Sequence, residues 1–114
     1  MSIFTGYPFS RGSVHITGSD LGDRSDFTTG FFSDVQGVDI KKHIWAYKKN
    51  REIFRRMETY RGELAGSHPS FAPESSAACV RLHDSQSGDI QDILYTAEDD
   101  KSIEEFVQKN VGTT

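Results

Sequence analysis

The sequence predicts one domain that mixes strands with helices, and two periodicities along the chain predict it. Polar and apolar residues alternate strictly over residues 13–17, which is typical of a half-buried strand whose Val14 and Ile16 face inward. Apolar residues recur at helical spacing over residues 39–64 and again after Thr96. With 114 residues the chain can bury one modest core but is too short for a nucleotide-binding domain plus a substrate domain.

The longest predicted element is a helix over residues 39–64, with Asp39 as its N-cap. Its apolar side chains form one broad arc, which predicts burial against two elements. That arc comprises Ile40, Ile44, Tyr47, Ile53, Phe54, Met57, Tyr60 and Leu64. Trp45 falls on the opposite, polar side, and Gly62 or Gly66 is expected to end the helix.

Shorter patterns lie on both sides of this helix. The aromatic run at residues 27–32 is compatible with a strand or with a packed loop. Residues 77–83 alternate like a second strand, and residues 90–95 are a weaker strand candidate. A C-terminal helix is expected to begin at Thr96-Ala97-Glu98-Asp99. Its apolar stripe comprises Ile103, Phe106 and Val107.

The composition argues against several function classes. Lys and Arg total 13 against 17 Asp and Glu, and a net charge of -4 lacks the basic field that nucleic acids require. No apolar run approaches the ~20 residues that span a bilayer, and the first residues do not resemble a signal peptide. The single Cys79 excludes an internal disulfide and suits a reducing compartment. Because the C-terminus is not a Ser-Lys-Leu-type signal either, a cytoplasmic protein is predicted.

Histidines are the first candidates for acid–base chemistry. His15 lies on the outward side of the first strand, where it is either a general base lining a cavity or a structural surface residue. His83 stands next to Asp84, but neighbours on a strand point to opposite faces, so a catalytic dyad requires a turn there. His43 and His68 are expected to be surface or capping groups. The spacing of the four histidines predicts no metal site.

Arginine and aromatic side chains are the candidates for ligand binding. Arg11 could hold a substrate carboxylate or carbonyl, or it could have a structural role at the start of the strand. Trp45, Tyr47 and Tyr60 could line an apolar cavity, although aromatics at helical spacing usually belong to a core. Cys79 has no activating neighbour in the sequence and is expected to be a core or half-buried thiol. The eight basic residues of the long helix are expected to form a solvated face.

Three phrases occur in a fixed order along the chain: YPFSRGSVHI at residues 7–16, DFTTGFFSD at 26–34 and WAYKKNRE at 45–52. The pattern continues through His68-Pro69 and YTAEDD at 95–100 to the closing VGTT. This ordered set resembles the alcohol oxidase branch of the glucose-methanol-choline (GMC) oxidoreductases, over nearly the whole chain. The resemblance implies the C-terminal, substrate-binding domain of that family. It therefore implies an α+β fold, with a small antiparallel sheet flanked by one long helix and a C-terminal helix.

Two parts of such an enzyme have no counterpart in these 114 residues. Nothing reads as the strand, glycine-rich turn and helix that hold a flavin pyrophosphate. In the family, the pair matching Thr113-Thr114 is followed by a Trp-His segment that carries the catalytic acid/base. The stretch 83–89 also looks shorter than its family counterpart. Residues 1–114 are therefore expected to form an incomplete substrate-binding domain that binds no FAD alone and cannot oxidise alcohols alone.

Three functional hypotheses remain open. The first is a truncated alcohol oxidase-like protein that contributes an alcohol- or carbonyl-binding domain beside a separate flavin-binding chain. The second is an autonomous, cofactor-free isomerase, cyclase or lyase acting on a small organic ligand. Its candidate residues are His15, His83, Asp84, Arg11 and Tyr60. The third is a dimeric interaction module, because a sheet edge without neighbouring strands exposes backbone groups that a homodimer can cover.

Overall fold

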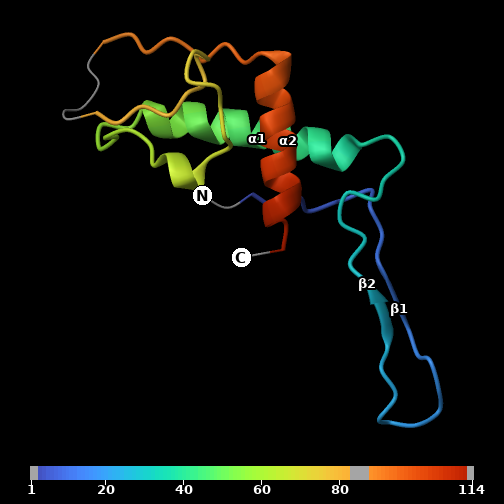
Figure 1. The fold of residues 1–114 in the computed structure, drawn as a ribbon. Helices are drawn as coiled ribbons and strands as arrows, with labels where there is room; N and C mark the ends of the chain where they lie inside the picture. The colour runs from blue at the N-terminus through green and yellow to red at the C-terminus, as the bar shows by residue number, and fades with distance from the viewer. Residues whose placement is uncertain (1–2, 83–87, 113–114) are drawn as a thin grey trace.

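The computed structural model describes residues 3–82 and 88–112 (Figure 1). In chain order the elements are strand β1 (Ser13–His15), strand β2 (Asp26–Thr28), helix α1 (Val38–Arg55), the single 3₁₀ turn η1 (Ala65–Ser67) and helix α2 (Ala97–Asn110). The α+β class is therefore confirmed. The two helices cross and contact each other, and the two strands form one antiparallel hairpin.

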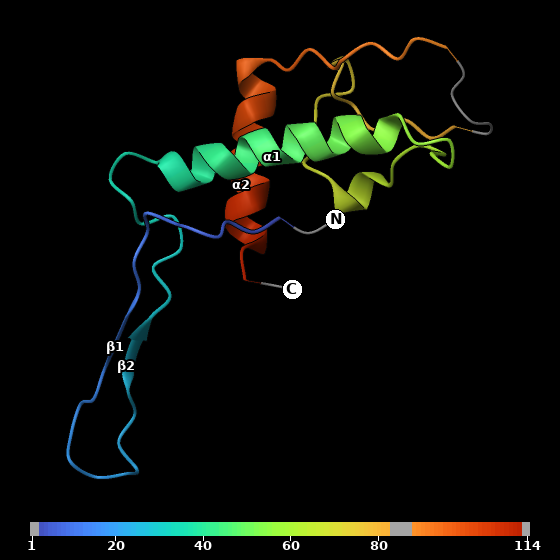
Figure 2. The same ribbon diagram turned by 180° about the vertical axis from the view of Figure 1, so that it is seen from behind.

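The hairpin extends away from the helices (Figures 1 and 2). Val14 pairs with Phe27, and neither strand contacts either helix. Val14 is 64% exposed and Ile16 is 88% exposed. The prediction that these two side chains face inward is therefore wrong. Within the described part of the chain no second layer covers the hairpin, so both of its faces meet solvent.

Helix α1 begins at Val38, after Gly37 in the left-handed conformation with a φ of 60°. Asp39 is thus the second residue of the helix, and the prediction that it is the N-cap is wrong. Its buried carboxylate instead accepts hydrogen bonds from the backbone amides of Phe9 and Ser10, at 3.1 and 2.7 Å. Burial by itself would raise the pKa of Asp39, but hydrogen bonds from Ser10 and Phe9 outweigh it and hold the pKa well below its usual range.

Helix α1 ends at Arg55, nine residues before the predicted end at position 64. A turn follows, and the chain reverses so that Gly62 bridges Arg81 in antiparallel fashion. Gly62 has a φ of 92°, and a Cβ there would lie 2.3 Å from the carbonyl oxygen of Val80. Only glycine permits this close approach. The long-range contact therefore overrides the apolar pattern that predicted a longer helix.

The predicted strands at 77–83 and 90–95 are absent from the described residues. The first is reduced to the single bridge at Arg81. Residues 90–95 form no regular secondary structure, and side chains in and just after α1, rather than a partner strand, bond to their backbone groups. Glu52 accepts a hydrogen bond from the amide of Ile93 at 2.9 Å, and Arg56, one residue beyond the helix, donates to the carbonyl of Ile90 at 2.8 Å.

Helix α2 begins as predicted, at a capping box formed by Thr96 and Asp99. Its Ile103 is fully buried and belongs to a small core. Ile40, Tyr47 and Ala77 are also buried. Trp45 is 64% exposed, which confirms its predicted place on the polar side of α1.

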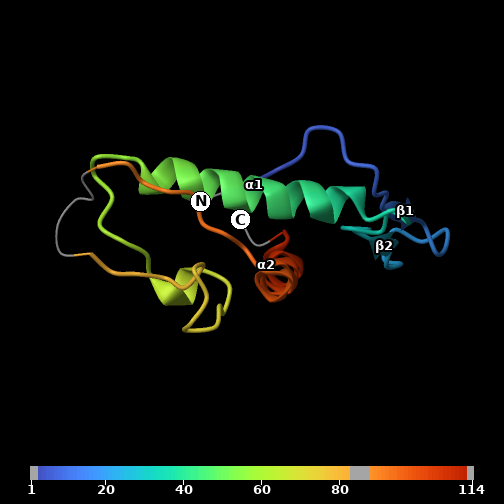
Figure 3. The same ribbon diagram turned by 90° about the horizontal axis from the view of Figure 1, so that it is seen from above.

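The molecule is elongated, with principal extents of 65, 27 and 25 Å (Figure 3). Its radius of gyration is 18.5 Å, against about 13 Å expected for a compact domain of this length. Many large apolar side chains are exposed, among them Phe4, Tyr7, Leu21, Val35 and Leu94. In the described ranges no helix is long and apolar enough to cross a membrane.

Candidate functional site

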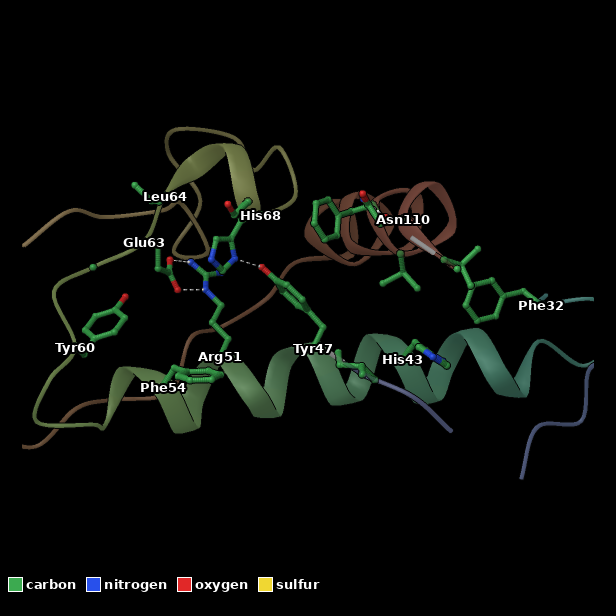
Figure 4. A pocket seen from close by; sticks show the side chains of 17 residues that line it. Phe32, His43, Tyr47, Arg51, Phe54, Tyr60, Glu63, Leu64, His68 and Asn110 are labelled. Atoms are coloured by element: carbon green, nitrogen blue, oxygen red, sulfur yellow. Dashed lines mark hydrogen bonds and ion pairs between the residues drawn. The ribbon is translucent and has the colours of Figure 1, made fainter. Parts of the chain in front are cut away.

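A cavity of about 720 Å³ lies along α1, between the helix, the segment 60–68 and the C-terminal half of α2 (Figure 4). Helix α1 contributes the side chains of His43, Tyr47, Arg51 and Phe54 at successive helical turns. Aromatic and aliphatic side chains make up most of the wall. The other lining residues are Ile3, Phe32, Tyr60, Gly62, Glu63, Leu64, Ser67, His68, Phe106, Val107, Asn110, Val111 and Gly112.

Arg51 and Glu63 form a buried ion pair in the wall of this cavity. The Arg51 Nε donates to Glu63 Oε1 at 2.6 Å, and Nη2 donates to Oε2 at 2.5 Å, so the pair is bidentate. The same Nη2 also donates to the carbonyl of Ala77 at 2.8 Å. Burial lowers the pKa of Arg51, but the hydrogen bonds and charge of Glu63 outweigh it and raise the pKa above its usual value. The pair joins α1 to two loop segments.

Tyr47 and His68 form the second polar pair of the site. The Tyr47 hydroxyl lies 2.7 Å from His68 Nδ1, and the two rings meet edge to face with centroids 6.0 Å apart. Tyr47 is only 2% exposed, and burial raises its pKa well above the ordinary value. Burial lowers the pKa of the half-buried His68. Near neutral pH the tyrosine is therefore protonated and the imidazole is neutral.

Further aromatic side chains surround the two pairs. The Phe71 ring is tilted against that of Tyr47, with 6.5 Å between the centroids. It also faces the Arg51 guanidinium, with 5.1 Å between the guanidinium carbon and the ring centroid. Tyr60 borders the cavity from the turn after α1, and burial raises its pKa to about 12. The half-buried Cys79 also has a raised pKa because of burial, which confirms the predicted half-buried thiol. Near neutral pH, Tyr47, Tyr60, His68 and Cys79 are therefore neutral, and the charges of the site lie in the Arg51–Glu63 ion pair.

Of the predicted site residues that the structure describes, only Tyr47 and Tyr60 line this cavity. Trp45 points away from it on the exposed side of α1, and His15 is exposed on the hairpin. Arg11 is exposed and uses its guanidinium to hold the backbone carbonyls of its own segment. His83 and Asp84 lie outside the described residues.

Arg51, Glu63 and His68 were missed as site residues. His68 is half-buried and paired with Tyr47, so the prediction of a surface or capping group is wrong for it. The sequence did contain a signal for Arg51. It follows Tyr47 by four positions and precedes Phe54 by three, and this helical spacing places it on the apolar face of α1. A charged residue on a buried face requires a partner of opposite charge. No local signal identifies Glu63 as that partner.

The described residues do not fit a flavin pyrophosphate, which requires a free helix N-terminus after a glycine-rich turn. At α2 the first turn carries Glu98, Asp99 and Asp100, and Asp99 already accepts from the Thr96 amide. At α1 the carboxylate of Asp34 accepts from the first helical amide. These negative charges repel an anion at both helix N-termini. Among the described residues there is also no group of three or more His, Cys, Asp or Glu side chains that could hold a metal ion.

No family model matches the chain. Curated alcohol oxidases do match it over 97% of its length. Alcohol oxidase 1 of Komagataella phaffii is 32% identical, alcohol oxidase of Pichia angusta is 34% identical and alcohol oxidase of Candida boidinii is 31% identical. The chain spans only 22% of each relative.

The alignment to the Komagataella protein covers 149 residues, whereas this chain has 114, so at least 35 positions of that relative have no counterpart here. The shared part is consistent with the C-terminal region of GMC oxidoreductases. The predicted resemblance is confirmed: nearly the whole of this chain is homologous to a segment that makes up 22% of an alcohol oxidase.

Proposed function

We propose that these 114 residues act as the substrate-side segment of an alcohol oxidase-like flavoprotein, where they contribute a small-molecule cavity and depend on other residues for the FAD. The observation that carries the proposal is the homology to alcohol oxidases over 97% of the chain. The proposed domain is residues 1–114, an incomplete GMC-type substrate-binding domain. Flavin oxidation of an alcohol needs a hydride acceptor and a proton acceptor beside the substrate carbon. The flavin supplies the first of these when it is bound.

Two structural features support dependence on a further part. The radius of gyration of 18.5 Å and the exposed aromatic side chains are unusual for a self-sufficient domain of this length. The hairpin also exposes apolar side chains on one face, where the paired residues Val14 and Phe27 are 64% and 63% exposed. We propose that a flavin-bearing portion, in the same chain or in a separate one, covers these surfaces. Alternatively, a homodimer that pairs the hairpin edges of two copies of the chain would cover the exposed hairpin.

A segment replacement tests the proposal. The homologous segment of the Komagataella phaffii alcohol oxidase 1 is exchanged for these 114 residues, and the purified chimera is assayed for flavin absorption and for alcohol-dependent oxygen consumption. We expect both signals in the chimera and neither in a control from which the segment is simply deleted. A chimera that is folded and monodisperse yet fails to retain flavin would contradict the proposal.

The cofactor-free alternative makes a different demand on the structure. An isomerase, cyclase or lyase needs an acid–base pair beside its ligand. Of its candidate residues that the structure describes, His15, Arg11 and Tyr60, only Tyr60 borders the cavity. The pair that does lie in the cavity, Tyr47 and His68, is the one observation in its favour. Turnover of a small carbonyl compound by the chain without added cofactor, lost in His68→Leu and kept in His15→Leu, would support that alternative.

A further inference from the structure

We propose that His68 is the ligand-recognising group of the cavity, held by Tyr47 in the tautomer that donates from Nε2, and that it selects a neutral, largely apolar molecule with a carbonyl or hydroxyl oxygen. This inference rests on the small-molecule-binding part of the proposed function. It specifies the atom that recognises the ligand and the charge that the ligand carries.

The Tyr47 hydroxyl determines the tautomer. It is buried, and its hydrogen bond to His68 Nδ1 is the only one that joins it to another described residue. If the hydroxyl only accepted, its own O–H would be buried without a partner, which costs free energy. Tyr47 therefore donates to Nδ1, because burial keeps the phenol protonated. Neutral imidazole then carries its proton on Nε2.

His68 Nε2 is available to a ligand. Among the described residues no hydrogen bond engages it, whereas Nδ1 is held by Tyr47, and the residue is half-buried in the cavity wall (Figure 4). An N–H group in an apolar wall binds an acceptor oxygen and cannot bind a second donor. Carbonyl and hydroxyl oxygens are the neutral acceptors of that kind.

The charge of the wall selects a neutral ligand. Arg51 and Glu63 are the only Lys, Arg, Asp or Glu side chains that line the described cavity, and they neutralise each other in a bidentate pair. A charged ligand would meet this largely apolar wall without an opposite charge free to receive it. The rest of the wall includes Phe32, Phe54 and Phe106, which suits an apolar body.

One feature of the same wall favours a different ligand. Arg51 Nη1 is buried and has no hydrogen-bond partner among the described residues. If a ligand reached that nitrogen, a carboxylate would be preferred over a neutral oxygen. Recognition by His68 therefore requires a neutral ligand, whereas recognition by Arg51 requires an anionic one.

A matched set of aromatic probes separates them: benzaldehyde and benzyl alcohol as neutral acceptors, benzoate as the anion and benzylamine as the cation. Each is titrated into the ¹⁵N-labelled 114-residue chain, and the imidazole nitrogens of His68 are followed by NMR. Before any ligand is added, we expect a pyridine-like Nδ1 and a pyrrole-like Nε2. In Tyr47→Phe that pattern is expected to give way to a tautomer mixture. We expect both neutral probes to shift Nε2 and to bind at least tenfold more tightly than either charged probe.

Variants locate the recognising atom. His68→Leu removes the donor and should weaken benzaldehyde binding roughly three- to tenfold, as expected for one neutral hydrogen bond. His68→Gln keeps a donor and should retain most of the affinity, and His15→Leu, on the exposed hairpin, should not change it. Benzoate binding as tightly as benzaldehyde, or an equal loss in the His15 variant, would overturn the proposal. The proposal would also be overturned if His68 shows the expected tautomer but binds neither neutral probe.

The two proposals can fail separately. A chimera that retains flavin and oxidises alcohol while the probes ignore His68 would leave the alcohol oxidase assignment intact and remove this inference. If the probes bind at His68 but the chimera is inactive, the inference about His68 stands and the alcohol oxidase assignment is removed.

Discussion

The guanidinium of Arg51 and the carboxylate of Glu63 meet in a buried, bidentate ion pair that joins α1 to the chain segment after it, with 2.6 Å between Nε and Oε1. Arg51 lies within α1, and Glu63 follows it by twelve positions, eight residues after the helix ends at Arg55. The pair therefore holds against the helix the returning segment whose Gly62 bridges Arg81. Its removal should therefore loosen the wall of the cavity as well as the fold.

Glu63→Gln leaves the Arg51 charge buried without a countercharge. We expect the free energy of unfolding to fall by about 3–5 kcal/mol, measured by urea denaturation. Glu105→Gln, on the exposed side of α2, is the control and should change it by less than about 0.5 kcal/mol. Equal stabilities of the Glu63 and Glu105 variants would show that the ion pair contributes nothing.

Gly62→Ala tests the close approach between residues 62 and 80. With a φ of 92° and a Cβ position 2.3 Å from the Val80 carbonyl, alanine must displace backbone, and we expect a loss of about 1–3 kcal/mol. Gly66→Ala is the matched control, because no atom lies within 4 Å of its Cβ position. If thermal denaturation shows the two variants to be alike, residues 62 and 80 do not meet as described.

Ile103→Ala tests the core between the helices. Ile103 is fully buried, so the cavity left by the substitution should cost about 2–5 kcal/mol. Val14→Ala on the hairpin removes a side chain that is 64% exposed and should cost less than about 0.5 kcal/mol. A large loss at Val14 in the chain alone would mean that something covers the hairpin in solution, and light scattering would then identify a dimer.

Asp39 makes stability depend on acid pH. Burial would raise its pKa, but hydrogen bonds from Ser10 and Phe9 lower it below the unfolded value near 4. The unfolded state then binds the proton more readily, so the contribution is present above about pH 4 and is lost as the pH falls through the folded pKa. We expect Asp39→Asn to flatten the fall in urea midpoint below about pH 4. Glu105→Gln should leave the wild-type slope unchanged.

The sequence predicts those parts of the molecule that local contacts determine. Helix α2 and its capping box at Thr96 follow from residues within one turn of each other. The end of α1 cannot be predicted from neighbouring residues, because it depends on the contact between Gly62 and Val80, which are far apart in the sequence. The strand patterns at 77–83 and 90–95 failed because a strand also needs a partner, and within the described chain side chains such as Glu52 take that place.

The candidate site shows the same division. Tyr47 and Tyr60 were identified from helical spacing alone, although Tyr60 reaches the cavity from a turn. His68 could not be identified in this way, because its partner Tyr47 is 21 positions away and only the folded chain brings the two together. The resemblance to alcohol oxidases was inferred from phrases in a fixed order along the chain, and the comparison with curated proteins confirmed the resemblance.

The central claim is that these 114 residues belong beside a flavin-binding portion. The most direct measurement is the visible absorption spectrum of the tagged chain, purified alone with added FAD and purified after co-expression with the remaining portion of an alcohol oxidase. The account predicts a colourless chain in the first preparation and a yellow, monodisperse complex in the second. A chain that retains flavin in the first preparation, or one that remains colourless and uncomplexed in the second, would contradict it.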